Sequence, residues 1–277
     1  SYDIYIDCDI LSMSGELIRK NSSAHRVAII TDDIVDGLYS SIVESSLRDH
    51  GFDVIKFVFP NGEESKSHDT LIKIYSFLSQ NGITRSDILV ALGGGLVGDI
   101  TGYVAATYLR GLGFVQIPTT FLSQIDSSVG GKTGVNIDEG KNLVGAFYQP
   151  LCVVCDTSTL STLSDEIFAD GVAEAVKYGM RENEDLFNKL HKENIDSILN
   201  EVIFECISIK RDIVEQDELD KGERMKLNFG HTLGHAIEKH YNYSGITHGR
   251  AIAIGMCVFT KLAEKYGMCD NGIYDKL

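Results

Sequence analysis

Long apolar runs are missing from this sequence. No stretch of about 18 apolar residues occurs, which excludes a helix that spans a membrane. Basic residues are scarce as well: 25 lysines and arginines stand against 40 aspartates and glutamates, giving a net charge of −15. An acidic surface repels phosphate, so we expect no nucleic-acid partner, and an anionic small-molecule substrate would require a local basic pocket.

The opening stretch SYDIYIDCDI lacks the basic region and apolar core of a signal peptide. Among the six cysteines, only Cys152 and Cys155 have the CxxC spacing, and no second such pair exists. The pair falls in the apolar, strand-like run LCVVCD, which disfavours a zinc or redox role. We therefore expect reduced thiols and a cytoplasmic protein.

Two different patterns divide the 277 residues. In the first part, short apolar runs such as HRVAIITDD and DILVALGGG alternate with amphipathic stretches, which predicts a parallel sheet flanked by helices. Beyond about residue 160 strand-like runs stop and helical periodicity takes over. We expect an α/β domain at residues 1–157 and an all-α domain at residues 158–277.

Glycines cluster after a predicted buried strand, in ALGGGLVGDITGY (Ala91–Tyr103). Free backbone N–H groups at the start of the following helix favour a pyrophosphate, although a tight strand–helix turn explains the motif equally well. Upstream, PNGEESKS offers Glu63 and Lys66 in a loop. An acidic residue there suits ribose hydroxyls, whereas a solvated charged loop is the simpler interpretation.

The most unusual stretch is PTTFLSQIDSSVGGKTGVNIDEGKNLVGAFYQP, Pro118–Pro150. We interpret it as a long polar loop, and loops of this length are mostly functional. Lys132 and Lys141, together with Arg110, would form the basic pocket that an anionic substrate requires.

The stretch LNFGHTLGHAIEKH places His231 and His235 on one helix face. Two histidines are too few for a catalytic zinc, and His248 and Glu174 are candidates to complete the set. Metal binding, proton transfer and simple packing all remain open from the spacing. Glu174 also stands three residues before Lys177, the spacing of an ordinary surface ion pair.

Taken together, the segments resemble the 3-dehydroquinate synthase family of sugar-phosphate cyclases. The segments that carry the resemblance, in order, are GEESK, LGGGLVGDITGYVAATYLRG, QIPTTFLSQIDSSVGGKTGVN, GKNLVGAFYQP, AEAVKYG, LNFGHTLGHAIE and HGRAIAIGM. The resemblance implies a nucleotide-binding α/β domain, an all-α domain, and a homodimer. It also implies NAD and a divalent metal, usually zinc, with cobalt or another divalent metal as alternatives.

The activity that the resemblance implies is conversion of 3-deoxy-D-arabino-heptulosonate 7-phosphate to 3-dehydroquinate and phosphate, a step of the shikimate pathway. The reaction runs through transient oxidation by NAD, phosphate elimination, re-reduction and intramolecular aldol closure. Such an enzyme is a carbon–oxygen lyase that regenerates its cofactor.

The resemblance also implies roles for individual residues. The metal ligands would be Glu174, His231 and His248, with His235 facing the substrate. Further substrate-side or catalytic residues would be Lys132, Lys177, Asn228, Arg224, Asp126, Asn142, Lys210 and Arg110. Residues that would hold NAD are Glu63, Lys66, Gly94, Gly95, Asp99, Thr119, Thr120, Lys132, Lys141 and Thr162.

Several alternatives stay open at this point. Cyclases acting on other sugar phosphates are disfavoured by Lys132, Arg224 and Asn228, whereas a relative acting on an aminated substrate is not excluded. Glycerol and iron-containing alcohol dehydrogenases share the two-domain plan but carry out net oxidation. A catalytically dead paralogue is a third reading, since family members usually continue beyond the point matching Leu277. Arg250 and Ile167 depart from the family pattern, which has acidic residues there.

Overall fold

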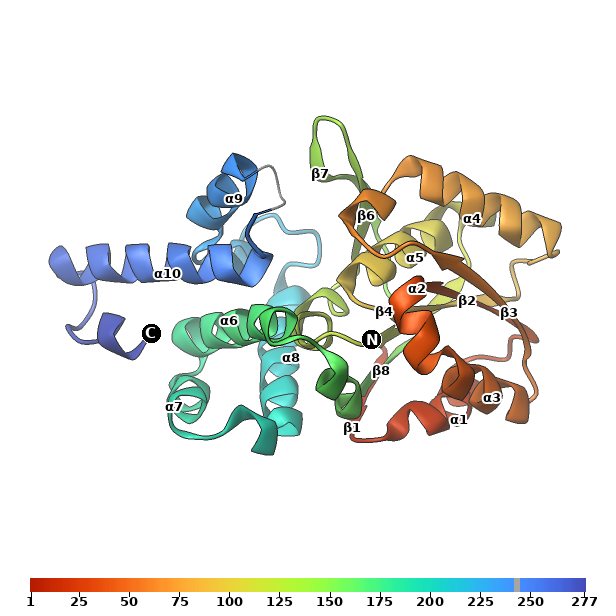
Figure 1. Cartoon of the computed structure of the whole chain (residues 1–277), viewed down its shortest axis with the longest axis horizontal. Helices are drawn as coiled ribbons and strands as arrows, with labels where there is room; N and C mark the ends of the chain where they lie inside the picture. Colours follow the sequence, from red (N-terminus) through yellow and green to blue (C-terminus); the bar gives the residue numbers. More distant parts are fainter. Residues whose placement is uncertain (242–244) are drawn as a thin grey trace. The chain divides into compact units, whose positions relative to one another are not determined.

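The computed structural model describes residues 1–241 and 245–277, and the chain divides into two compact units, Ser1–Ser161 and Thr162–Leu277 (Figure 1). The sequence predicted two domains with a boundary after residue 157. That domain boundary stays a prediction. Within the described residues, no helix is both long and apolar enough to cross a lipid bilayer.

The first unit is built on a parallel six-stranded sheet, as the sequence predicted. In spatial order its strands are β1 (Asp3–Asp7), β8 (Cys152–Asp156), β5 (Gly113–Pro118), β4 (Ile88–Gly93), β2 (Arg26–Asp32) and β3 (Asp53–Phe59). From β2 the chain first adds β3 on one side and then β4 on the other. The strand order therefore reverses between β2 and β4, and such a point is where open α/β sheets usually bind ligands.

Helices cover both faces of this sheet. Their bounds are α1 (Ser14–Asn21), α2 (Asp33–Val35), α3 (Ser41–Asp49), α4 (His68–Gln80) and α5 (Gly95–Thr107). Figure 1 shows α1 and α3 on one side and α4 and α5 on the other. Alternate residues of β2 follow the same division: Val27 and Ile29 join the core under α1 and α3, and Ala28 and Ile30 join the core under α4 and α5.

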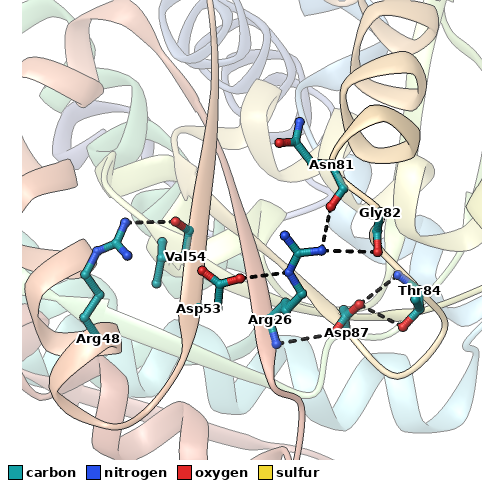
Figure 2. A network of polar contacts seen from close by, with 8 residues as sticks. All are labelled: Arg26, Arg48, Asp53, Val54, Asn81, Gly82, Thr84 and Asp87. Carbon is teal, nitrogen blue, oxygen red and sulfur yellow. Dashed lines mark hydrogen bonds and ion pairs between the residues drawn. The ribbon is translucent and has the colours of Figure 1, made fainter.

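A network of polar contacts closes the amino end of the sheet (Figure 2). Arg26, the first residue of β2, donates from Nε to Asp53 Oδ2 over 2.9 Å and from a terminal nitrogen to the carbonyl of Asn81 over 2.5 Å. The carboxylate of Asp87 accepts from the backbone N–H of Arg26 and of Thr84, at 3.2 and 2.8 Å. This network joins β2, β3 and the segment before β4 at the edge opposite to the glycine cluster that follows β4.

The stretch interpreted as a long loop is largely ordered instead. Residues Ser123–Ser127 form a helical turn, and β6 (Lys132–Ile137) and β7 (Gly140–Phe147) form an antiparallel hairpin. A Cβ at Gly145 would lie 2.0 Å from the carbonyl oxygen of Thr133, so the two strands meet at a position that only glycine fits. The frequent glycines interrupt the alternation of apolar and polar residues by which a strand is recognised in a sequence.

The second unit is all-α in the part of it that the structure describes, in line with the predicted fold class. Its helices are α6 (Asp165–Glu182), α7 (Glu184–Lys192), α8 (Leu199–Gln216), α9 (His231–His240) and α10 (His248–Lys265). Helix α6 packs against α7, α8 and α10, and α10 also packs against α9. The first residues of α9 and α10 are both histidines, so helix packing in this unit fixes where those imidazoles lie.

Candidate functional site

Three predicted ligands come together in the second unit. Oε1 of Glu174, on α6, lies 3.5 Å from Nε2 of His231 and 3.5 Å from Nε2 of His248. One ligand atom from each of the three residues lies within 4.8 Å of the others. Glu174 is 1% exposed, so a negative charge on its carboxylate would need positive partners in this low-dielectric interior.

Close helix packing produces this convergence. Gly230, which precedes α9, has φ 80°, and a Cβ at Gly255 of α10 would lie 2.2 Å from the Gly230 carbonyl oxygen. Asp170 lies on α6 one turn before Glu174, and its carboxylate accepts from the N–H of Gly249 over 2.9 Å. This hydrogen bond attaches the start of α10 to α6. The two histidines that begin α9 and α10 are thereby brought to the same carboxylate.

His231 is suited to offer a lone pair. Burial, together with the nearby Lys177 ammonium, outweighs the opposite effect of the Glu174 carboxylate and lowers the pKa of its imidazole to about 4. Its Nδ1 lies 3.2 Å from the carbonyl oxygen of Phe229. Donation to that carbonyl leaves the Nε2 lone pair directed at Glu174, which is the usual arrangement of a metal-binding histidine.

His248 lies between two carboxylates. Its Nε2 faces Glu174, and its Nδ1 lies 3.3 Å from Oε1 of Glu238. Burial alone would lower the pKa of this imidazole, but the contacts with Glu174 and Glu238 outweigh burial and raise it to about 10. The pocket therefore favours a positive charge at this position, and a divalent cation would satisfy that preference as a proton does.

The geometry and chemistry of the three residues fit a divalent cation. For metal–ligand bonds of about 2.0–2.1 Å in a tetrahedral site, neighbouring ligand atoms lie about 3.3–3.4 Å apart. The separations of 3.5 Å from the Glu174 oxygen to each imidazole nitrogen are close to this value. Two histidines and one glutamate also leave a fourth position for an oxygen of a bound molecule.

Lys177 gives the cluster a positive charge of its own. It lies on α6 three residues after Glu174 and forms an ion pair with Oε2 of that carboxylate. The side chains are 3% and 1% exposed, so this pair is buried and differs from the surface pair that the spacing alone suggests.

His231 and His235, the two histidines at i, i+4 spacing, differ in burial: His231 is half-buried and His235 is exposed. The ring of His235 lies 5.3 Å from that of His231 and 6.1 Å from that of His248, between centroids, while its side chain is exposed. His235 also belongs to a second group of potential metal donors with Glu238 and His248, again within 4.8 Å. Sequence reasoning missed Glu238, although its place seven residues after His231 puts it on the same helix face.

The remaining predicted residues of the second unit are placed as follows. Lys210 of α8 and Arg224, in the short helix Glu223–Asn228, are both buried. The guanidinium of Arg224 donates to the Glu218 carbonyl over 3.0 Å. At least one of its N–H groups therefore makes a structural hydrogen bond. Asn228 and Thr162 are exposed. Arg250 and Ile167, which depart from the family pattern, are exposed as well.

In the first unit, Lys66 is the centre of a polar cluster. Its ammonium donates to Oδ2 of Asp99 and to Oδ1 of Asn142, each over 2.5 Å. Asn136, for which the sequence indicated no specific role, donates to Glu63 Oε1 over 2.7 Å and accepts from the Asn142 N–H over 2.9 Å. The hairpin is thus tied to the loop that carries Glu63 and Lys66.

Lys141 extends this cluster, with its ammonium 3.5 Å from Glu63 Oε1. Lys132, at the start of β6, and Arg110, which follows α5, are exposed, whereas Asp126 is half-buried in the helical turn. The basic pocket expected from Lys132, Lys141 and Arg110 stays a prediction.

The glycine cluster lies at the carboxyl end of β4, beside the point where the strand order reverses. Gly94 is the N-cap of α5, and no side chain caps that helix start. A Cβ at Gly94 would lie 3.1 Å from a methyl of Thr120, and one at Gly95 would lie 2.8 Å from Ser127 Oγ. The side chains of Thr120 and Ser127 therefore lie close to these glycines, while the first N–H groups of α5 have no side-chain cap, which is a feature of phosphate-binding helix starts.

Comparison with known proteins identifies the family. The family model for the 3-dehydroquinate synthase N-terminal region matches residues 56–170, and the model for the C-terminal region matches residues 171–277. The chain belongs to the 3-dehydroquinate synthase family.

Curated members of the family match along the whole chain. The 3-dehydroquinate synthase of Clostridium acetobutylicum is 47% identical over all of this chain and 79% of its own length. The enzyme of Streptococcus suis is 46% identical, again over all of this chain and 79% of its own length. This coverage includes every predicted site residue.

Solved structures of related cyclases have the same fold. A 2-deoxy-scyllo-inosose synthase complexed with carbaglucose-6-phosphate, NAD⁺ and Co²⁺ is 30% identical, with a TM-score of 0.85 over 99% of this chain and 77% of that one. The 2-epi-5-epi-valiolone synthase of Streptomyces hygroscopicus with NAD⁺ and Zn²⁺ is 26% identical, with a TM-score of 0.89 over 100% and 78%. An iron-containing alcohol dehydrogenase of Thermotoga maritima, 18% identical with a TM-score of 0.67 over 95% of this chain and 78% of that one, shares the fold alone.

Proposed function

We propose that this chain is a 3-dehydroquinate synthase, a lyase of the shikimate pathway that converts 3-deoxy-D-arabino-heptulosonate 7-phosphate to 3-dehydroquinate and phosphate. The observation that carries the proposal is the 47% identity to a curated 3-dehydroquinate synthase over the whole chain. The family thereby supports the function, and the converging Glu174, His231 and His248 support its need for a metal.

Two groups would complete the enzyme. When bound, NAD supplies a hydride acceptor and the divalent cation supplies Lewis acidity. Glu174, His231 and His248 would hold the cation, which is zinc in our proposal, with cobalt or another divalent metal as substitutes. The carboxylate would supply charge and the two imidazoles would supply neutral nitrogen ligands.

The first unit would hold NAD. The start of α5 at Gly94 and Gly95, which no side chain caps, would take the pyrophosphate, with Thr119 and Thr120 beside it at the carboxyl end of β5. Glu63 would accept from ribose hydroxyls, because its carboxylate already lies in the polar cluster around Lys66. Further contacts are proposed for Asp99, Lys132, Lys141 and Thr162.

Cationic and polar side chains would bind the anionic substrate on a protein of net charge −15. Lys177, buried against Glu174, and Lys210 and Arg224, also buried, are held at fixed positions and would orient substrate oxygens. His235, exposed beside the other imidazoles, would move a proton. The other residues proposed for the substrate are Asp126, Asn142, Asn228, Lys132 and Arg110.

Phosphate release measured together with absorbance at 340 nm tests this proposal. With the heptulosonate phosphate, NAD and zinc, we expect phosphate to be released continuously while NADH does not accumulate, and a chelator should stop the release. NADH accumulating in proportion to substrate would instead support an alcohol dehydrogenase. Binding of NAD without any phosphate release would support a catalytically dead paralogue.

We further propose that the enzyme is a cytoplasmic homodimer. The six cysteines are all free thiols, which supports a reducing compartment. Light scattering coupled to size-exclusion chromatography measures the oligomeric state: a mass twice the 30.5 kDa of one chain is expected, and a mass of one chain would contradict the dimer.

A further inference from the structure

Glu238 is the one acidic side chain of helix α9, and it is almost completely buried. It is 7% exposed and lies two turns after His231, on the same face of the helix. Its Oε1 is 3.3 Å from Nδ1 of His248, whose other ring nitrogen faces Glu174 over 3.5 Å. The imidazole of His248 is therefore contacted at both nitrogens by carboxylates from two different helices.

A cation bound at Nε2 would give the two nitrogens of His248 different roles. A carboxylate accepts hydrogen bonds when ionised and cannot donate them. When Nε2 of His248 binds a cation, Nδ1 carries the ring proton and donates it to Glu238. The hydrogen bond then fixes both the rotation of the ring and the direction of its free lone pair.

The neighbouring histidine is held in a comparable way by the backbone. Nδ1 of His231 lies 3.2 Å from the Phe229 carbonyl oxygen, so that ring has a partner two residues before it on the same chain segment. His248 begins α10, and the partner of its Nδ1 comes from α9 instead. Glu238 thus provides for His248 what a main-chain carbonyl provides for His231.

We propose that Glu238 is a positioning residue for the metal site, orienting His248 through Nδ1 so that Nε2 faces the cation. The proposal rests on the metal role assigned above to Glu174, His231 and His248. It adds a residue that does not touch the metal or the substrate and acts through the ligand it holds.

A competing role for Glu238 is that of a ligand, since donor atoms of His235, Glu238 and His248 also lie within 4.8 Å of one another. A cation there would need Nδ1 of His248 as its ligand. Nε2 of the same ring is directed at Glu174, so filling both sites would require the imidazole to lose both ring protons and bridge two dications. His235 is also exposed, whereas protein ligands of buried sites are held by their surroundings.

The test compares Glu238→Gln, which keeps the size of the side chain but removes its charge, with Glu166→Gln as a matched control. Glu166 lies on α6 and is exposed. We expect Glu238→Gln to weaken zinc binding about 10–100-fold, measured by competition with a chromogenic chelator. The visible spectrum of the cobalt-loaded chain should change as well, since it reports the ligand geometry. The control should match the unaltered chain in both, and circular dichroism should show all three chains folded.

Unchanged zinc affinity and an unchanged cobalt spectrum in Glu238→Gln would overturn the proposal. So would two zinc ions per chain that fall to one in the variant, because Glu238 would then be a ligand. Failure of the unaltered chain to bind zinc would overturn both this inference and the proposed function. Normal zinc binding with the expected loss in the variant, but no phosphate release, would contradict the function alone and leave the positioning role supported.

Discussion

Among single residues, Glu174 organises the charges of the second unit. Its buried carboxylate contacts the ammonium of Lys177 and the imidazoles of His231 and His248. In a low-dielectric interior such a carboxylate needs positive partners, and without a metal ion Lys177 and a protonated His248 supply them. A bound cation would take over part of this compensation.

Replacing Lys177 with methionine tests this charge balance. Removing one partner of a buried ion pair destabilises a protein by about 3–5 kcal/mol, and we expect a loss of that size in the metal-free chain. At saturating zinc the loss should be smaller, because the cation offsets the charge on Glu174. Thermal or urea unfolding with and without zinc measures both values.

Lys226→Met is the matched control, since Lys226 pairs with Glu223 at the same i, i+3 spacing but both side chains are about half exposed, at 49% and 50%. Exposed pairs contribute little to stability, so this variant should unfold almost as the unaltered chain does. Equal losses in the two variants would contradict the account of the buried pair.

The CxxC spacing of Cys152 and Cys155 places the two thiols on opposite faces of the sheet. Residues three apart on a strand point to opposite faces of the sheet, and both side chains are fully buried in β8. Burial raises the pKa of the Cys152 thiol to about 12 and raises that of Cys155 as well. Iodoacetamide at pH 8 should therefore label the exposed Cys8 first, and label Cys152 and Cys155 only on unfolding.

The raised pKa of the Cys152 thiol should make the free energy of unfolding depend on pH. The folded pKa of Cys152, about 12, lies above the ordinary value of 9.0, so the unfolded chain loses this proton first. Its contribution to stability is complete below pH 9 and is lost as the pH rises towards 12. Urea unfolding between pH 8 and 11 should show a steeper decline for the unaltered chain than for Cys152→Ala. Identical slopes would count against the raised pKa.

Single residues also show how far sequence reading reached the site. Glu174, His231 and His248 were predicted together, and they converge within one unit. The burial of Lys177 was only hinted at by its small neighbours, because spacing does not reveal which face of α6 is covered. Glu238 was missed because its partner His248 lies on a different helix, and contacts between helices leave no local pattern in the sequence.

At the scale of elements, the strands with continuous apolar runs were predicted correctly. Strands β2, β4, β5 and β8 are buried, and their continuous apolar residues predict buried strands. Strand β1 was not recognised, since it is short, acidic at both ends and lies at the edge of the sheet. The hairpin was missed because its glycines, which the close approach of β6 and β7 requires, resemble loop residues.

The polar network at the amino end of the sheet should contribute to the free energy of unfolding but not to the affinity for NAD. Asp87→Ala removes the acceptor of the Thr84 and Arg26 N–H groups, which are partly buried, and each lost hydrogen bond should cost about 0.5–1.5 kcal/mol. NAD affinity should stay unchanged, since the proposed pyrophosphate site lies at the opposite, carboxyl end of β4. Asp49→Ala, an exposed residue of α3, is the control.

Chemical unfolding and NAD titration by calorimetry measure the two quantities separately. A weaker NAD affinity in folded Asp87→Ala would contradict the separation between the stabilising end and the binding end of the sheet.

For the whole molecule, we propose that the first unit binds NAD, that the second unit binds the metal, and that the cofactor is regenerated in each turnover. Composition and charge disfavour nucleic-acid and membrane-spanning classes but do not select a reaction. The ordered set of motifs selected the family, and the identity to curated 3-dehydroquinate synthases supports it. The arrangement of the two units is a property that local sequence patterns do not encode.

The most direct test of the central claim is identification of the product by ¹³C NMR with NAD present at one molecule per hundred of substrate. The account predicts complete conversion of the heptulosonate phosphate to 3-dehydroquinate, with one phosphate released per molecule and NAD recovered in its oxidised form. Conversion that stops when the NAD is reduced, or an oxidised open-chain product in place of a carbocycle, would contradict it.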